Sequence, residues 1–173
     1  MVDISQILRG SRELAVRSNF PPFVGPERES TPLNATPYMA HISDVQEDGF
    51  LSNRAAFLAE LSVGLDQLPS IGAKPIAVLI GGSAIGPKPD PSDLDCVVFY
   101  EVIEGESPSK HLSKFQKQLK SRRIDARLIP IDGDPLLLIK AVSFFTTLYS
   151  KNSGSLEIVR GLVLLDCRPQ RTF

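Results

Sequence analysis

The sequence has 173 residues, 42% hydrophobic and 23% charged, which is the composition of one globular domain and excludes a disordered chain. Nineteen Lys and Arg residues against 20 Asp and Glu give a formal net charge of −1, which offers no attraction for long duplex DNA. Cys96 and Cys167 are too few for a disulfide framework or a zinc centre, so we expect reduced thiols. The most apolar stretch, residues 136–149, is shorter than a membrane span, so we expect a cytoplasmic protein that does not contact membranes.

The N-terminal part of the chain predicts two helices separated by a Pro-rich segment. Asp3 is placed to cap a first helix with apolar residues at helical spacing as far as Ala15. Five prolines between Phe20 and Tyr38 remove backbone donors, so we expect an ordered loop or arm there, packed near the functional site. A second helix is predicted to start at Ser52 or Asn53 and to end at Pro69.

The rest of the chain predicts strands alternating with helices. Apolar runs predict strands at residues 76–80, 94–102, 124–131 and 158–165, and helices are predicted at residues 109–123 and from the Asp134 cap to about Tyr149. We therefore expect an α/β (α+β) fold with a mixed sheet of four to five strands flanked by helices. Residues 1–173 are expected to form one domain, in which 1–70 are an N-terminal extension and 71–165 the core. Phe144 and Phe145, on an apolar helix, are expected in the core.

Gly81, Gly82 and Ser83 follow the first predicted strand of this core. Without side chains the backbone can turn sharply there and bring its N–H groups close to a phosphate. A tight turn with no ligand is the alternative interpretation.

Asp93 and Asp95 flank Leu94 at the start of the next strand, so period-2 geometry places both carboxylates on one face of the sheet. Adjacent carboxylates repel each other unless a cation lies between them, and carboxylate oxygens suit Mg²⁺. The alternative is that Asp93 caps a turn and Asp95 pairs with a nearby Lys or Arg.

Asp125 adds a third carboxylate near the start of the following strand, among apolar neighbours. If that strand lies beside the Asp93 and Asp95 strand, the three carboxylates converge and can hold two Mg²⁺ ions. Alternatively, Arg127 lies two residues further on the same face and can neutralise Asp125 as an ion pair.

Gly82-Ser83, nine intervening residues, Asp93-Leu94-Asp95 and the later Asp125 together resemble the signature of the polymerase beta-type nucleotidyltransferase superfamily. Residues 21–38 and 144–165 are similar to a group of uncharacterised bacterial nucleotidyltransferase-like proteins. The resemblance implies a nucleotidyltransferase-like fold and transfer of a nucleoside monophosphate from a nucleoside triphosphate to a hydroxyl on protein, RNA or a small molecule.

The resemblance also assigns roles to residues. It implies that Asp93, Asp95 and Asp125 are catalytic and hold two Mg²⁺ ions, with Mn²⁺ as a substitute, and that Gly81, Gly82 and Ser83 contact the nucleotide. The sequence lacks the Arg that many members carry after the Gly-Ser pair, so the phosphate charge would fall to Lys88, Arg127 or the basic residues within 117–123.

Three hypotheses follow from these residues. The first is an active nucleotidyltransferase. The second is a catalytically inactive member that serves as a nucleotide sensor or a partner-binding module, which the missing Arg and the extra loop acid Asp90 favour. The third is a metal-dependent nuclease that uses the same acids.

Overall fold

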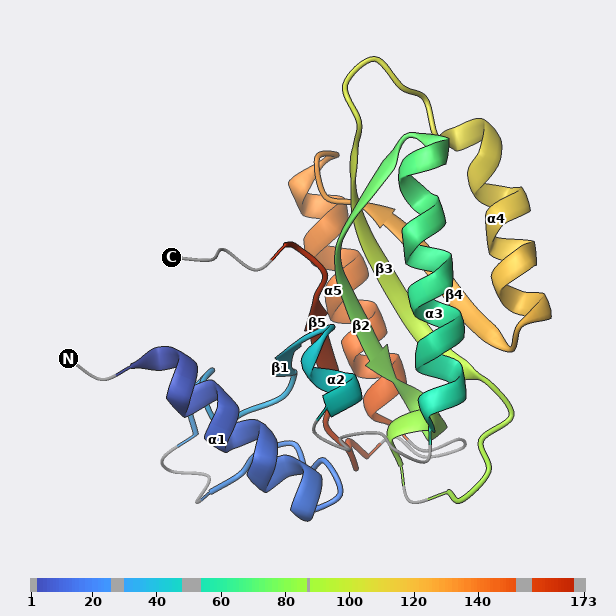
Figure 1. Ribbon diagram of the computed structural model, residues 1–173. Helices are drawn as coiled ribbons and strands as arrows, with labels where there is room; N and C mark the ends of the chain where they lie inside the picture. The colour runs from blue at the N-terminus through green and yellow to red at the C-terminus, as the bar shows by residue number, and fades with distance from the viewer. Residues whose placement is uncertain (1–2, 26–29, 48–53, 87, 152–156, 170–173) are drawn as a thin grey trace.

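The structure is a computed structural model that describes residues 3–25, 30–47, 54–86, 88–151 and 157–169. Its centre is a five-stranded mixed sheet in the order β1-β5-β2-β3-β4 (Figure 1). The strands are β1 (Tyr38–His41), β2 (Ala73–Gly81), β3 (Leu94–Val102), β4 (Ile124–Pro130) and β5 (Val163–Asp166). β2 is antiparallel to both β3 and β5, whereas the pairs β3–β4 and β1–β5 are parallel. The predicted mixed α+β fold is confirmed.

The N-terminal segment adds a strand to this sheet. Helix α1 (Ile4–Arg17) begins at the predicted cap, where the Asp3 carboxylate accepts the N–H of Ser5 at 2.9 Å. The described residues of the Pro-rich segment after it are irregular, as expected, and lead into β1, followed by α2 (Asp44–Glu47). Buried Arg12 of α1 forms an ion pair with Asp44 at 3.2 Å, which joins α1 to α2. β1 and α2 were not expected.

Helices α3 (Ala55–Gln67) and α4 (Ser109–Ser121) cover one face of the sheet (Figure 1). A Cβ on Gly64 of α3 would lie 2.5 Å from the Leu119 side chain of α4, so the absence of a side chain lets the two helices approach closely. The predicted start of α3 at Ser52 or Asn53 lies outside the described residues. The α-helix ends at Gln67, just before Pro69 as predicted, and the chain continues as the 3-10 turn η3 (Leu68–Ile71) to the left-handed Gly72.

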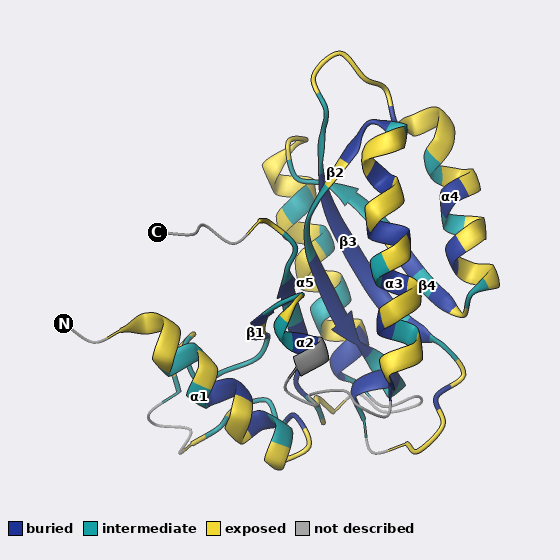
Figure 2. Cartoon of the chain, in the orientation of Figure 1, coloured by how far each residue is buried: buried dark blue, intermediate teal, exposed yellow. Residues whose placement is uncertain are grey.

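Helix α5 (Pro135–Ser150) covers the opposite face and begins as predicted, with the Asp134 carboxylate accepting the N–H of Leu136 at 2.8 Å. Much of its outer surface is exposed although most of its residues are apolar (Figure 2). Phe145 packs partly against the core, but Phe144 is 58% exposed, so the expectation that both rings are buried was wrong.

The predicted strand at 158–165 is shorter at its start, because Ile158 makes only an isolated bridge with Lys151 and β5 begins at Val163. Both cysteines are free thiols, with Cys96 fully buried in β3. Among the described residues, no helix is both long and apolar enough to cross a membrane.

Candidate functional site

The candidate site lies at one end of the central strands, where Gly81, Asp95 and Asp125 occupy one cross-strand row. The sheet register pairs Gly81 of β2 with Asp95 of β3, and Asp95 with Asp125 of β4. Residues opposite each other in neighbouring strands project from the same face of a sheet. The structure therefore brings Asp95 and Asp125 together on one face, since β4 does lie beside β3.

That face is the one covered by α5. A Cβ on Gly81 would lie 2.4 Å from the Cβ of Tyr149, so the α5 backbone passes directly over the row. The Tyr149 hydroxyl donates to the Cys96 carbonyl at 3.4 Å. Burial raises the pKa of Tyr149, and Cys96, Asp95 and Asp125 raise it further. Tyr149 is thus a neutral aromatic neighbour of the carboxylates, which the sequence analysis did not single out.

Gly82 lies close against the Asp95 side chain. Its φ of +65° is left-handed, and a Cβ there would lie 2.3 Å from the Asp95 Oδ2 atom. Any side chain at position 82 would be strained and would also displace the carboxylate. Gly82 begins the 3-10 turn η4 (Gly82–Ile85), and Ser83 is the second residue of that turn.

The electrostatics of the row centre on Asp95. Partial burial raises the pKa of this carboxyl, the negative charges of Asp93 and Asp125 raise it further, and Arg127 lowers it. Arg127 lies 3.6 Å from Asp125, which is the ion pair that the sequence left open as an alternative. Asp93 accepts the Ser92 hydroxyl at 2.8 Å. Within the described parts of the chain, no three His, Cys, Asp or Glu side chains lie close enough together to hold a metal ion.

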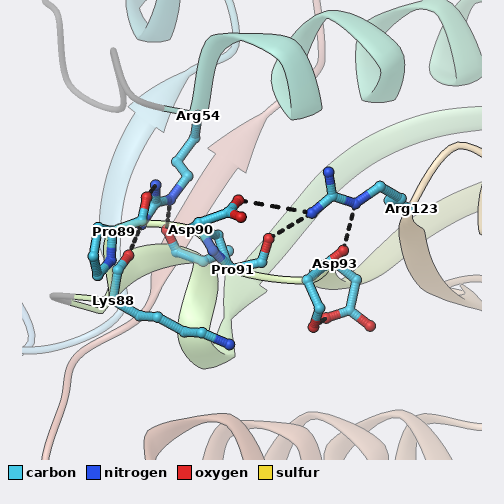
Figure 3. Close-up of polar contacts among 9 residues, drawn as sticks. Arg54, Lys88, Pro89, Asp90, Pro91, Asp93 and Arg123 are labelled. Carbon is cyan, nitrogen blue, oxygen red and sulfur yellow. Dashed lines mark hydrogen bonds and ion pairs between the residues drawn. The ribbon is translucent and has the colours of Figure 1, made fainter.

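Two arginines hold the loop between η4 and β3 from its two ends (Figure 3). Arg54, only 2% exposed, donates to the carbonyls of Ala84 and Pro89 at 2.9 Å each and also to that of Lys88. Arg123 donates to the carbonyls of Ser92 at 2.6 Å and Pro91 at 2.7 Å, and its guanidinium lies 5.0 Å from the Phe57 ring centre. The loop that carries Asp93 is therefore fixed by charge-assisted hydrogen bonds.

Arg160 holds the turn itself, because its Nη1 donates to the Gly82 carbonyl at 2.7 Å. The Pro-rich arm lies against the same segment: the Thr36 hydroxyl accepts the Leu162 N–H at 2.7 Å, and Gly161 donates to the Phe20 carbonyl. The expectation that the arm packs near the site agrees with these contacts. Arg54 and Arg160 were both missed, since their partners are backbone carbonyls 30 or more residues away, and no local pattern marks such contacts.

The remaining predicted residues have less specific surroundings. Lys88 is exposed, and its carbonyl rather than its ammonium has the hydrogen bond given above. Just past α4, which ends at Ser121 rather than at Arg123, Arg122 pairs with Glu60 of α3 at 3.0 Å and Arg123 holds the loop, so both have structural contacts.

Comparison with known proteins gives one match to a family model, described as a family of unknown function (DUF6932), over residues 18–166. Searches among curated proteins and among solved structures gave no match.

Proposed function

Since the chain belongs to the DUF6932 family, whose function is unknown, we propose from the site itself that it transfers a nucleoside monophosphate from a nucleoside triphosphate to a hydroxyl acceptor. The acceptor is a protein, an RNA or a small molecule, and the reaction depends on Mg²⁺. The observation that carries the proposal is the row of Asp95 and Asp125 on adjacent strands with the Gly82 turn packed against Asp95.

The donor atoms fit a hard divalent cation. Asp95 is partly buried among like charges that raise its pKa, and a cation bound there would relieve that repulsion. Asp95 and Asp125, which the sheet register pairs, would hold the ion together with triphosphate oxygens, and Asp93 would join them by moving closer to the pair than it lies in this structure. When bound, Mg²⁺ neutralises triphosphate charge and polarises the reacting oxygens.

The residues of the chain then have separate tasks. The Gly81–Ser83 turn, held by Arg160, offers a close backbone approach to the triphosphate. The acceptor oxygen forms a bond to the α-phosphorus while the bond from that phosphorus to the bridging oxygen breaks and pyrophosphate leaves. The hydroxyl proton passes to a carboxylate, a role for which Asp125 is placed beside Asp95. Arg54 and Arg123 hold the loop that carries Asp93 in one conformation, so the loop does not have to be ordered when the substrate binds.

A second candidate function is a catalytically inactive nucleotide sensor or partner-binding module. The observation that favours it is the use of nearby arginines: Arg127 is paired with Asp125, and Arg123 and Arg160 donate to backbone carbonyls. With these groups engaged, less positive charge faces a triphosphate.

The experiment is to incubate the purified protein with each α-labelled nucleoside triphosphate, Mg²⁺ and a cell lysate, and to follow covalent label. We expect label on an acceptor with the parent protein and at least a 100-fold loss with Asp95→Asn, the size typical of losing a group that acts in the transition state.

The matched control is Asp90→Asn, which removes an acid of the same loop whose side chain is 95% exposed and lies 3.9 Å from Arg123. This variant should keep its activity. No transfer with any nucleotide, together with saturable nucleotide binding, would favour the sensor. Equal loss in Asp90→Asn and Asp95→Asn would contradict the assignment of Asp95.

A further inference from the structure

The outer surface of α5 has an apolar stripe that no described residue covers. Leu137 is 67% exposed, Phe144 58% and Leu148 49%, and Ala141 lies between Leu137 and Phe144 on the same side of the helix. The intervals between these four residues are 4, 3 and 4, the spacing of a seam on which another helix packs. Monomeric proteins rarely leave such a stripe open to water.

Charged residues extend this stripe at both ends with the same spacing. Asp134, the N-cap, precedes Leu137 by three residues, and Lys151, the C-cap, follows Leu148 by three. We call the set Asp134, Leu137, Ala141, Phe144, Leu148 and Lys151 the α5 seam. Its only charges are an acid at one end and a base at the other. Lys140, three residues after Leu137 and four before Phe144, flanks the seam without belonging to it.

The α5 seam is complementary to itself when two helices run in opposite directions. Its positions are symmetric about the middle of the helix, so an antiparallel copy brings Asp134 level with Lys151, Leu137 level with Leu148, and Ala141 level with Phe144. The smallest residue thus meets the largest, and opposite charges meet at both ends. A parallel pair would instead place Phe144 against Phe144 and like charge against like charge.

We propose that the α5 seam is the interface of a homodimer in which two copies of α5 pack antiparallel about a twofold axis. Such an interface is isologous, since the same patch serves both subunits. Ile158 is 58% exposed and bridges to Lys151, so it extends the apolar surface past the end of α5 toward the first turn of the partner's helix. Because Tyr149 lies over the Gly81 row, the two candidate sites lie at opposite ends of the helix pair.

The first test compares two substitutions on the same helix by sedimentation velocity over a range of protein concentrations. Phe144→Glu places a charge in the seam, and we expect it to convert the dimer to monomer. Ile139→Glu places the same charge at a residue that is 61% exposed but outside the seam, and we expect it to remain dimeric. Circular dichroism checks that both variants stay folded. A parent protein that is monomeric at all concentrations, or a dimer unaffected by Phe144→Glu, would overturn the proposal.

The second test reads the direction of the helices. In a Cys167→Ser background, which leaves only the fully buried Cys96, Leu137→Cys and Leu148→Cys are prepared separately and then mixed under oxidation. The mixture should form a disulfide-linked dimer, whereas each variant alone should not. Cross-linking of Leu137→Cys with itself would indicate a parallel pair and contradict the antiparallel interface. Neither test depends on catalysis, so its outcome is independent of the proposed function.

Discussion

Gly82 and Asp95 constrain each other at the residue scale. The chain turns back at Gly82 with a left-handed φ of +65°, and the space that a Cβ would take is filled by the Asp95 carboxylate. A turn of this kind places backbone groups, rather than a side chain, next to the carboxylate. That arrangement is useful where a bulky anion has to approach both, and it makes position 82 sensitive to substitution.

Gly82→Ala should therefore lower both the stability of the fold and the transfer activity. Left-handed φ at a residue with a Cβ costs roughly 1–2 kcal/mol of stability, and the added methyl also displaces Asp95. Gly105→Ala is the matched control, because Gly105 has a φ of +82° with nothing within 4 Å of its missing Cβ. Thermal unfolding should show a similar backbone cost in both variants, with a further loss in Gly82→Ala alone, and transfer activity should fall only in Gly82→Ala. Equal effects of the two substitutions on both measurements would contradict the contact.

The carboxylates of the site could be predicted from the sequence, and most of their surroundings could not. The apolar run around Asp125 predicts a neighbouring strand, and β4 does pair Asp125 with Asp95. Strand alternation was expected to place Asp93 and Asp95 on one face, but β3 begins at Leu94, so Asp93 lies in the loop before the strand. Both are local patterns, whereas the contacts of Arg54 and Arg160 depend on where distant backbone carbonyls lie in three dimensions. The ion pair of Arg127 with Asp125 was among the stated alternatives, because it is also local.

At the scale of elements, the described residues of the loop between η4 and β3 have no regular structure and few of their carbonyls are satisfied by the backbone of the loop itself. From a position just before α3, Arg54 supplies donors to two of those carbonyls and to that of Ala84 in η4. Arg123 supplies donors to two more loop carbonyls from the end of α4. The loop is therefore ordered by the two helices on the face of the sheet opposite α5.

Arg54→Met should loosen this loop, since the apolar stem is kept and the buried donors are lost. Hydrogen bonds from a charged donor contribute roughly 1.5–3 kcal/mol each on net, and the buried Ala84 carbonyl left without its donor adds to the cost. Arg122→Met is the control, because its 3.0 Å ion pair with Glu60 is exposed and contributes at most about 1 kcal/mol. Limited proteolysis should cut the loop faster in Arg54→Met, with a larger fall in Tm. Comparable proteolysis of both variants would argue against the role of Arg54.

Element predictions succeeded where periodicity and caps agree and failed where an element is short. The α5 start was predictable from Asp134 and Pro135, and β3 from its continuous apolar run. β1 has only four residues and follows a proline-rich segment, so it has no pattern of its own and depends on pairing with β5. The burial of Phe144 was predicted wrongly because an apolar helix in one chain can be completed by contacts outside that chain.

For the whole molecule, the sheet is built from both ends of the chain. β1 from the N-terminal segment pairs with β5 from the C-terminal segment, and β5 pairs with β2, whose end forms the Gly82 turn. The arm, β5 and the turn are therefore one connected structure, and the stability of the fold depends on the same residues that shape the site.

The row of carboxylates lowers the stability of this fold at neutral pH. Burial, Asp93 and Asp125 raise the pKa of Asp95 in the folded protein above that of an unfolded chain. The folded state then binds the Asp95 proton more tightly than the unfolded state does, so the contribution of Asp95 to stability falls as pH rises from about 3.8 through the raised pKa. Above that range the loss is complete.

Asp95→Asn should remove this loss. In metal-free buffer at pH 7 we expect the variant to be more stable than the parent by up to about 1 kcal/mol, the size of a like-charge pair across strands, or a rise in Tm of roughly 2–4 °C at this chain length. The gain should shrink as the pH is lowered through the raised pKa of Asp95, because the parent carboxyl then becomes protonated. Asp90→Asn, at an exposed position, should show no such pH-dependent gain. A variant less stable than the parent at pH 7 would contradict net repulsion in the row. We thus expect Asp95→Asn to gain stability and lose transfer activity. This trade-off indicates that the fold keeps repelling charges together because the site requires them.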